Sequence, residues 1–429
     1  MPATILIGAQ WGDEGKGRVA DWLASESDVV ARYAGGDNAG HTVAVGDKVY
    51  KLHLIPSGIL HSHVTCVLGN GMVVNPINLM REILDLRAQG VAVTPENLQI
   101  STRAHLITPG HVALDAASEA KRGAGKIGTT LRGIGPAYMD KTGRTGVRAG
   151  QMLDVEDYAE VMGRHLTAVN EKLCRDGFDP ISIEAATAEA VDAASFLRAF
   201  VCDTSLKLNE RLRNGDRVLC EGAQGTFLDI DHGDYPFVTS SSPTAGGALT
   251  GLGIGPLGVD RIVGVAKAYS TRVGSGPLPT ELEGPLAERL RGTGQNFWDE
   301  FGTTTRRPRR CGWLDLVTLR YAAMINGFTE LVLTKLDILS GFETLQVATA
   351  YRIGGEIFET VPTTTAQMEI AEPVYEACAG WQEDISGVRR WADLPQATRD
   401  YVDRIAELVD VPIRTVSVGP ERDQLVHRQ

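Results

Sequence analysis

The chain has 429 residues, of which 43% are hydrophobic and 22% charged, a balance typical of a globular protein with a large core. Its formal net charge of −12 argues against nonspecific nucleic-acid binding, because no overall positive charge offsets repulsion by the phosphates. Its 6 cysteines form no C-x-x-C pair and no apolar run reaches the length of a membrane span, so we expect a reduced cytoplasmic protein that binds neither nucleic acid nor membrane.

Short apolar runs that predict strands alternate along the chain with segments whose apolar residues recur at the helical period. This alternation predicts an α/β protein with a large, mostly parallel central sheet flanked by helices. We expect residues 1–429 to form a single domain, with a mainly helical subdomain at approximately 100–215 inserted in the sheet. The expected strands are 4–8, 28–33, 65–68, 217–220, 261–266, 330–334 and 413–418, and the clearest helices are 76–89, 313–326 and 395–409.

A glycine-rich turn follows the first expected strand and precedes a helix, in GAQWGDEGKG at residues 8–17. Such a turn lets the backbone and the helix N-terminus bind phosphate, and Lys16 adds positive charge. It differs from the usual phosphate loop, because Gly17 stands where a hydroxyl residue normally follows the lysine. Asp13 and Glu14 would suit such a turn if they do chemistry or hold Mg²⁺, and the alternative is a tight turn with surface acids.

A second glycine-rich loop, RYAGGDNAGHT at residues 32–42, follows the next expected strand. It offers His41, Asn38 and the carbonyl of Gly40. Two loops at adjacent strand ends can face one ligand across a crevice, so Asp13 and His41 are a candidate base and acid around a reacting group. A single histidine is more often structural, although a position between a glycine and a threonine in a loop favours function.

A third element, LVLTKLD, ends at Asp337 with Lys335 two residues before it. A carboxylate at a strand end accepts both N1–H and N2–H₂ of guanine, whereas adenine offers one donor beside one acceptor. The lysine stem can lie over the face of the base. The later loop SVGP, residues 417–420, is a second possible wall of this pocket.

Three further stretches are rich in groups that bind anions. FGTTTRRPRRCGW at 301–313 suggests a local anion site, and GKIGTTLRGIGPAYMDKTGR at 125–144 combines glycine, hydroxyl and basic residues. The stretch at 220–247 contains a possible metal cluster of Asp229, Asp231 and His232, which alternatively brace the loop. Together the motifs suggest that GTP is used to join two other anionic substrates. The alternatives are a GTP-dependent regulatory switch and a nucleotide-dependent ligase of another pathway.

Several of these blocks resemble adenylosuccinate synthetase in order and spacing, from about residue 4 to 425: QWGDEGKGR, GGDNAGHT, GTTLRGIGPAY, EGAQGTFLDIDHGDYPFVTSS, AYSTRVGSGPLPTEL, RPRRCGWLD, TKLD and SVGP. The resemblance implies a P-loop-NTPase-like α/β fold with helical and loop subdomains. It also implies a homodimer that joins IMP and L-aspartate with GTP through 6-phosphoryl-IMP, as the first committed step of AMP biosynthesis. One Mg²⁺ per subunit is the expected cofactor.

The resemblance also implies the roles of individual residues. Asp13 would be the proton acceptor and a Mg²⁺ ligand, His41 the proton donor, Gln224 a third catalytic group, and the Gly40 carbonyl a second Mg²⁺ ligand. Arg144 would reach IMP from the partner subunit, and Arg306 departs from the pattern, because many members have glycine there. The implied GTP contacts are Gly12, Glu14, Gly15, Lys16, Gly17, Gly40, Thr42, Arg309, Lys335, Asp337, Ser417 and Gly419; the IMP contacts are Asp13, Lys16, Asn38, Thr130, Arg144, Gln224, Thr239 and Arg307; the aspartate contacts are Thr303, Thr304, Thr305 and Arg307.

Overall fold

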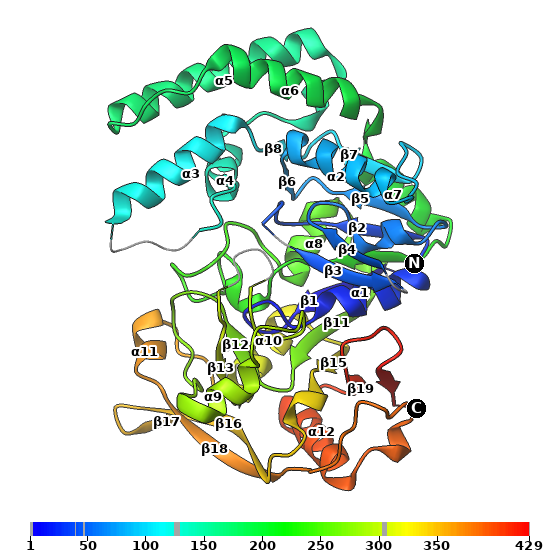
Figure 1. Cartoon of the computed structure of the whole chain (residues 1–429), viewed down its shortest axis with the longest axis vertical. Helices are drawn as coiled ribbons and strands as arrows, with labels where there is room; N and C mark the ends of the chain where they lie inside the picture. Colours follow the sequence, from blue (N-terminus) through cyan, green and yellow to red (C-terminus); the bar gives the residue numbers. More distant parts are fainter. Residues whose placement is uncertain (1–2, 39, 46–47, 124–128, 303–306, 429) are drawn as a thin grey trace. The chain divides into compact units, whose positions relative to one another are not determined.

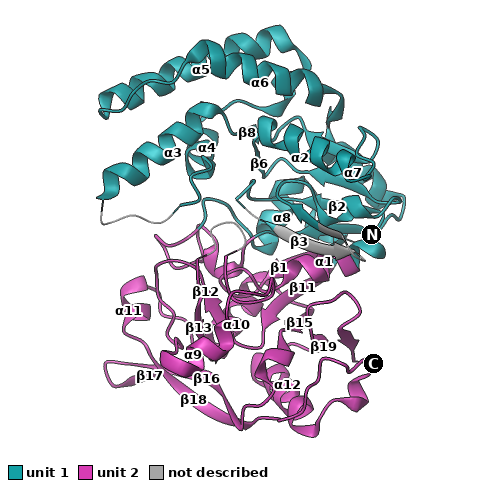
Figure 2. Cartoon of the chain, in the orientation of Figure 1, with its two compact units in different colours: residues 1–4, 23–223, 239–260 teal, residues 5–22, 224–238, 261–429 magenta. Residues whose placement is uncertain are grey.

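The structure is a computed structural model that describes residues 3–38, 40–45, 48–123, 129–302 and 307–428, without the side chains of 41–49. It divides into two compact units, each assembled from segments far apart in the sequence (Figure 2). Unit 1 comprises residues 1–4, 23–223 and 239–260, and unit 2 comprises residues 5–22, 224–238 and 261–429.

Unit 1 contains short strands and a series of helices, of which α5 and α6 run side by side in Figure 1. Helix α2 begins as predicted: Asn75 accepts a hydrogen bond from Asn78 N (3.1 Å), and Pro76 is the first helical residue. The elements are β2 Val29–Arg32, β3 His41–Val45, β4 Lys48–Leu52, β5 Thr65–Leu68, β6 Val73–Val74, α2 Pro76–Ala88, β7 Leu98–Ser101, β8 His105–Leu106, α3 Pro109–Arg122, α4 Ile134–Gly143, α5 Val155–Arg175, α6 Ile183–Leu197, β9 Val201–Cys202, α7 Thr204–Arg213, β10 Val218–Glu221 and α8 Ala245–Leu252.

Unit 2 contains the C-terminal part of the chain and most of β1 Ala3–Gly8, α1 Lys16–Ser25 and β11 Val259–Lys267. Its other elements are β12 Ser270–Arg272, α9 Gly284–Arg291, β13 Arg310–Gly312, β14 Leu314–Asp315, α10 Leu316–Asn326, β15 Glu330–Thr334, η7 Leu336–Leu339, β16 Thr344–Ile353, β17 Glu356–Phe358, α11 Thr365–Glu369, β18 Glu372–Ala379, α12 Gln396–Val409, β19 Ile413–Ser417 and β20 Leu425–His427.

Helix α10 begins at Leu316 rather than at the predicted 313, because the preceding residues form strand β14. Asp315 caps the helix, since its carboxylate accepts hydrogen bonds from Val317 N and Thr318 N (both 3.1 Å). Strand β14 pairs with β16, a contact between distant segments that the helical period of the local sequence does not reveal.

Ten strands form one sheet in the order β20-β19-β15-β11-β1-β10-β2-β5-β7-β9, which confirms the predicted large central sheet. The pairings β10·β2, β2·β5, β5·β7, β7·β9, β11·β15 and β15·β19 are parallel, and β20 runs antiparallel to β19 at one edge. In such a sheet the loops at the carboxyl ends of the strands are the usual place for a ligand. The smaller sheets β3-β4, β6-β8, β12-β13 and β14-β16-β17 (with β18 on β16) were not predicted.

The region predicted to be mainly helical contains α3 to α7, together with the short strands β8 and β9. Strand β9 pairs with β7 and so completes one edge of the large sheet. Asn170 closes the turn between α5 and α6 by exchanging two 2.9 Å hydrogen bonds with the backbone of Ile181. Among the helices that the structure describes, none has both the length and the apolar character needed to cross a bilayer.

Candidate functional site

The glycine-rich turn after β1 is closed from inside by Glu14, whose side chain is fully buried. Its carboxylate accepts hydrogen bonds from Gln10 N (3.0 Å), Gly12 N (2.8 Å) and Lys16 Nζ (2.6 Å). Gly12 and Gly15 both have φ of +85°, which favours glycine. Glu14 therefore stabilises the turn, and the amide groups at the start of α1 are the part of the turn suited to an anion.

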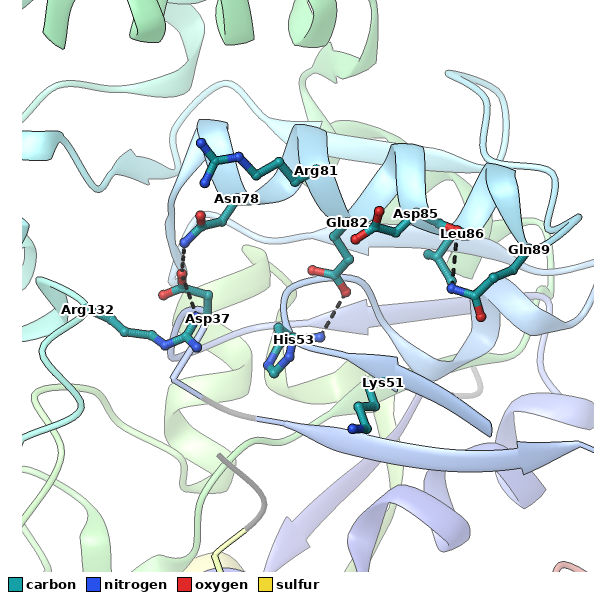
Figure 3. Close-up of a pocket in the computed structure, with 10 residues that line it drawn as sticks. All are labelled: Asp37, Lys51, His53, Asn78, Arg81, Glu82, Asp85, Leu86, Gln89 and Arg132. Atoms are coloured by element: carbon teal, nitrogen blue, oxygen red, sulfur yellow. Dashed lines mark hydrogen bonds and ion pairs between the residues drawn. The ribbon is translucent and has the colours of Figure 1, made fainter. Parts of the chain in front are cut away.

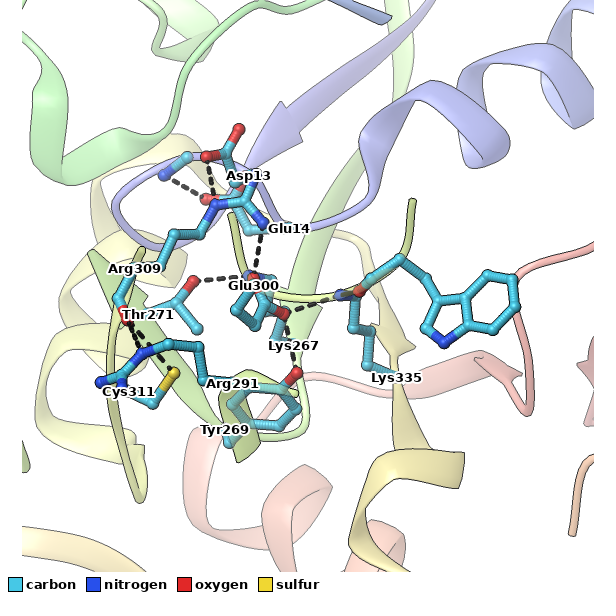
Figure 4. Close-up of polar contacts among 12 residues, drawn as sticks. Asp13, Glu14, Lys267, Tyr269, Thr271, Arg291, Glu300, Arg309, Cys311 and Lys335 are labelled. Atoms are coloured by element: carbon cyan, nitrogen blue, oxygen red, sulfur yellow. Dashed lines mark hydrogen bonds and ion pairs between the residues drawn. The ribbon is translucent and has the colours of Figure 1, made fainter. Parts of the chain in front are cut away.

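Asp13 lies at the tip of this turn, with its side chain 45% exposed and φ of +60°. Its Oδ2 accepts a hydrogen bond from Nε of Arg309 at 2.8 Å (Figure 4). Desolvation by the surrounding loop acts to raise the pKa of Asp13, but the positive charges of Arg309, Lys267 and Lys16 outweigh it and hold the pKa below its ordinary value. The carboxylate is therefore ionised at neutral pH, as a base or metal ligand must be.

A buried carboxylate, Glu300, lies at the centre of a group of charged side chains in unit 2 (Figure 4). Glu300 Oε2 accepts hydrogen bonds from Lys267 Nζ (2.8 Å) and Arg309 Nη1 (2.7 Å), and Oε1 accepts from Lys335 Nζ (2.7 Å) and Tyr269 Oη (2.7 Å). We call these five residues the Glu300 cluster. Sequence reasoning missed Glu300, Lys267 and Tyr269, although Lys267 directly follows an apolar strand run.

The charges of the Glu300 cluster shift one another's protonation. Burial raises the pKa of Glu300, but Lys267, Lys335 and Arg309 outweigh burial and hold the pKa well below its ordinary range. Burial lowers the pKa of Lys267 to about 8, and the negative charge of Glu300 offsets part of that effect. Glu300 therefore stays ionised, and its negative charge is shared among three cations.

Lys335 and Asp337 follow strand β15, where the sequence predicts a guanine pocket. Lys335 has φ of +59°, and its Nζ also donates to the carbonyl of Trp298 (2.5 Å). Asp337 is half-buried in the first turn of η7. Burial raises the pKa of Asp337, and Arg18 and Lys335 offset part of that rise. A carboxylate placed in this way at a strand end is suited to accept two adjacent donors.

Ser417 is the last residue of strand β19, the parallel neighbour of β15, and Gly419 follows the strand. Ser417 Oγ donates a hydrogen bond to the carbonyl of Gly419 (3.2 Å). The Arg18 guanidinium, from helix α1, contacts both the Ser417 hydroxyl and the Gly419 carbonyl. The ends of two adjacent strands thus carry all four residues that the sequence assigns to guanine.

Gln224 follows strand β10 and lies against the glycine-rich turn after β1. It has φ of +59°, and its side-chain nitrogen and oxygen are buried without a hydrogen-bond partner among the described residues. The adjoining backbone is close-packed, because a Cβ added at Gly225 would lie 2.5 Å from Gly12 N. A buried amide left unpaired is costly, and strained backbone is often found at functional sites.

The predicted aspartate loop is only partly described. Thr303, Thr304, Thr305 and Arg306 lie outside the described residues. The loop is closed at its roots, since Gly302 N donates to the Arg307 carbonyl (2.8 Å) and Phe301 bridges to Pro308. The Arg307 side chain is exposed, whereas Arg309 is buried in the Glu300 cluster.

Unit 1 brings three segments with predicted IMP contacts to the first half of α4 and the turn before it. Tyr138 on α4 accepts a hydrogen bond from Gly35 N (3.0 Å), close to the Asn38 loop. Ser240, next to Thr239, lies beside Gly135, where an added Cβ would be 3.6 Å from its Oγ. The segment containing Thr130 is held on α3 because Asp115 accepts from Thr129 Oγ1 (3.0 Å) and Gly133 N (2.9 Å).

A pocket of about 380 Å³ in unit 1 has walls of mixed charge (Figure 3). Asp37 accepts hydrogen bonds from Asn78 Nδ2 (2.5 Å) and Arg132 Nη1 (3.3 Å), so the segments that carry Asn38 and Thr130 are joined here. Glu82 accepts from the backbone amides of residues 53–55. Burial raises the pKa of Glu82, and these three hydrogen bonds offset part of the rise.

Arg144, by contrast, caps the other end of α4. It has φ of +63° and an exposed side chain. The helix spans Ile134–Gly143, so at 1.5 Å per residue Arg144 lies roughly 15 Å along the axis from Ile134 and roughly 9 Å from Tyr138, which binds the Gly35 segment. The side chains of His41 and Thr42 lie outside the described residues, although both belong to strand β3, and Gly40 precedes it.

Among the described residues, the structure does not bring together the metal ligands that the sequence suggested at Asp229, Asp231 and His232. Asp229 is buried, and its Oδ1 accepts from the amides of Asp231 (2.9 Å) and His232 (3.1 Å), so it braces the loop. The described residues contain instead a buried group of His111, Asp140 and His165. Its histidines are engaged by Asp140 and by Thr108, whose N–H donates to His111 Nδ1 (3.0 Å).

That hydrogen bond decides the tautomer of His111. Because Nδ1 accepts from Thr108 N, the ring proton resides on Nε2, which donates to Asp140 Oδ2 at 3.0 Å. A protonated Nε2 has no lone pair for a metal. The group therefore ties α3 to α4 by hydrogen bonds, and the hydrogen bond from His111 lowers the pKa of Asp140 to about 2.

Known proteins are similar to this chain over nearly its whole length. A family model described as adenylosuccinate synthetase matches residues 5–426. The adenylosuccinate synthetases of Moorella thermoacetica and Carboxydothermus hydrogenoformans are 52% and 50% identical to the chain, each over 99% of both sequences. The solved structure of fully ligated adenylosuccinate synthetase from Plasmodium falciparum matches with a TM-score of 0.93, at 39% identity over 99% of both chains.

A cyanophage S-2L succinoaminodeoxyadenylate synthetase, 20% identical, matches with a TM-score of 0.62 over 99% of this chain and 95% of that chain. At this identity the likeness shows the fold alone. The family model and the relatives at about half identity cover nearly the whole chain. The chain belongs to the adenylosuccinate synthetase family.

Proposed function

We propose that the protein performs the reaction of its family, the GTP-dependent ligation of IMP and L-aspartate to adenylosuccinate with release of GDP and phosphate, and that the loops described above carry it. Family membership supports the overall reaction, which belongs to AMP biosynthesis. The residue roles below are our assignments from the geometry and from the family motifs.

Asp13 is the base in this proposal. It takes the N1 proton of IMP, the electron pair moves onto O6, and O6 attacks the γ-phosphorus of GTP as GDP leaves. The amine of aspartate then attacks C6 and releases one proton, and the C6–O6 bond breaks as phosphate departs with O6. Phosphorylation helps because phosphate leaves more readily than an amide-like oxygen. The ionised state of Asp13, maintained by Arg309, supports this role.

The unpaired amide of Gln224 is the observation that carries the proposal. A buried donor and acceptor that find no partner among the described residues, on a residue with positive φ beside the Asp13 turn, are expensive unless a ligand pairs with them. A purine with a carbonyl at C6 supplies such a partner. The amide N–H can stabilise the negative charge that develops on O6 as N1 loses its proton.

The proposed cofactor is one Mg²⁺ per subunit. The half-exposed, ionised carboxylate of Asp13 fits a hard cation, which prefers oxygen ligands, and the backbone carbonyl of Gly40 is the second proposed ligand. When bound, such an ion neutralises charge on the transferring phosphoryl group. His41 is the proposed proton donor, and Thr42 and Thr303 to Thr305 remain proposed substrate contacts.

The proposed assembly is a homodimer in which Arg144 of the partner subunit contacts IMP. Within its own chain Arg144 is exposed at the C-terminal end of α4, whereas the segments of Thr130 and Thr239 lie at its N-terminal end. An exposed arginine is suited to bind a phosphate across an interface.

A single assay tests the function. Purified protein is incubated with GTP, Mg²⁺, IMP and L-aspartate, and adenylosuccinate is followed by absorbance while each component is omitted in turn. We expect product only in the complete mixture. GTP hydrolysis that needs neither IMP nor aspartate would indicate a regulatory switch instead, and product with another acceptor in place of IMP would indicate a different ligase.

A further inference from the structure

Glu300 and Arg309 lie at the two roots of the predicted aspartate loop. Arg309 N donates a hydrogen bond to the Glu300 carbonyl (2.8 Å), and one residue further in, Phe301 bridges to Pro308. The backbone therefore closes the loop at Glu300. Whatever fixes the Glu300 side chain also fixes the place from which the loop emerges.

The Glu300 side chain is anchored to two strands of the large sheet. One donor, Lys267, is the last residue of β11, and another, Lys335, follows β15. These strands are parallel neighbours, with Lys267 opposite Thr334. Each carboxylate oxygen of Glu300 accepts two hydrogen bonds, and the residue is 1% exposed, so its position is strongly determined.

The partners of Glu300 distinguish it from a carboxylate that only supports the fold. The family motifs assign Arg309 and Lys335 to GTP. Asp315 provides the contrast: it is equally buried in unit 2, but its donors are two backbone amides and the Tyr351 hydroxyl (2.5 Å). Removing the negative charge of Glu300 would leave several buried cations without a counter-charge, which is energetically costly.

We infer that Glu300 is a positioning residue that ties the roots of the aspartate loop to the guanine pocket, by holding Arg309 and Lys335 in the places that the ligation requires. The inference rests on the proposed function. In this role Glu300 itself contacts neither GTP nor aspartate, and it acts through the Arg309 and Lys335 side chains.

The test is Glu300→Gln, a change of nearly equal volume that removes the negative charge. Arg309 and Lys335 lose a charge-assisted partner, so we expect KM for GTP and for aspartate each to rise by about tenfold or more. IMP binding to the free enzyme, measured by calorimetry, should change less than about threefold, because none of the four side chains that donate hydrogen bonds to Glu300 is assigned to IMP.

Asp315→Asn is the matched control, since it neutralises an equally buried carboxylate of unit 2. A purely structural effect lowers the melting temperature or the active fraction in both variants and leaves the KM values unchanged. Unchanged KM values for GTP and aspartate in Glu300→Gln would overturn the inference, whatever the change in kcat.

Glu300→Gln leaves Lys267 as a buried cation and can prevent folding. The double variant with Lys267→Met restores the formal charge of the cluster, and should fold while keeping the raised KM values. Normal KM values in the folded double variant would also refute the inference. If the wild-type protein itself forms no adenylosuccinate, the proposed function fails instead, so the two failures are distinguishable.

Discussion

Arg309 joins Asp13 to Glu300: its Nε donates to Asp13 Oδ2 at 2.8 Å and its Nη1 to Glu300 Oε2 at 2.7 Å. One guanidinium thus bridges a half-exposed carboxylate and a buried one. The positive charge of Arg309 lowers the pKa of Asp13, which keeps the carboxylate ionised but also reduces its affinity for a proton.

The role of Asp13 as base is tested by Asp13→Asn. The amide keeps the volume and an acceptor for Arg309, so the protein should fold and bind nucleotide, but it cannot take the N1 proton. We expect turnover to fall by about 10²–10⁴-fold, measured as adenylosuccinate formed per second. More than about a tenth of wild-type activity would contradict the role.

Gln224→Leu separates stability from function. The amide has no partner among the described residues, so removing it should leave the free energy of unfolding unchanged or raise it by up to about 2 kcal/mol, as measured in urea. Turnover should nevertheless fall, because the donor to O6 is lost. A large loss of stability with normal turnover would show that the amide serves the fold.

Arg144 is predicted to act in the partner subunit's site. Arg144→Leu and Asp13→Ala proteins should each be nearly inactive, and mixing them should restore activity. A random heterodimer has one site in which both residues are intact. Subunit exchange is followed separately by a label, and exchange without recovered activity would argue against a shared site.

Asp337→Asn tests the guanine pocket. The new NH₂ group meets the amino group of guanine, so GTP should lose about 2–3 kcal/mol of binding, the cost of a buried unsatisfied donor. Xanthosine triphosphate carries an oxygen there and should become the better substrate. The measurement is kcat/KM for both nucleotides on wild type and variant. Equal losses with both would mean that Asp337 only supports the strand end.

Asp315 predicts a pH dependence of stability. Burial raises its pKa to about 6 from an ordinary 3.8, so between these values the folded state holds a proton that the unfolded state releases. Stability from this group is therefore fully present below about pH 4 and decreases by about 3 kcal/mol as the pH rises through 6.

Asp315→Asn removes this dependence, because the amide does not titrate. Urea unfolding of both proteins at pH 4.5, 5.5 and 7 should therefore show the variant gaining relative stability as the pH rises. A constant difference between the two proteins across this range would mean that Asp315 is ionised throughout in the folded state.

Much of the architecture follows from local sequence. Apolar runs predicted seven strands of the large sheet to within about two residues, and Asn75 with Pro76 predicted the start of α2, because strand period and helix capping depend on neighbouring residues. The glycine-rich turn with Asp13 could also be predicted from the sequence, since positive φ favours glycine at residues 12 and 15.

Tertiary structure alone decided the contacts between distant segments. No local pattern shows that Glu300 meets Lys267 and Lys335, or that Asp37 meets Arg132, since such pairs form only when the strands and loops have packed. The same is true of Glu14, which faces inward to close its own turn, and of the Gln224 amide, which is buried without a partner among the described residues. Sequence determines which groups stand at each strand end, whereas the three-dimensional packing determines which of them are buried together. Burial in turn shifts the protonation of these groups and sets the free-energy cost of leaving them unpaired.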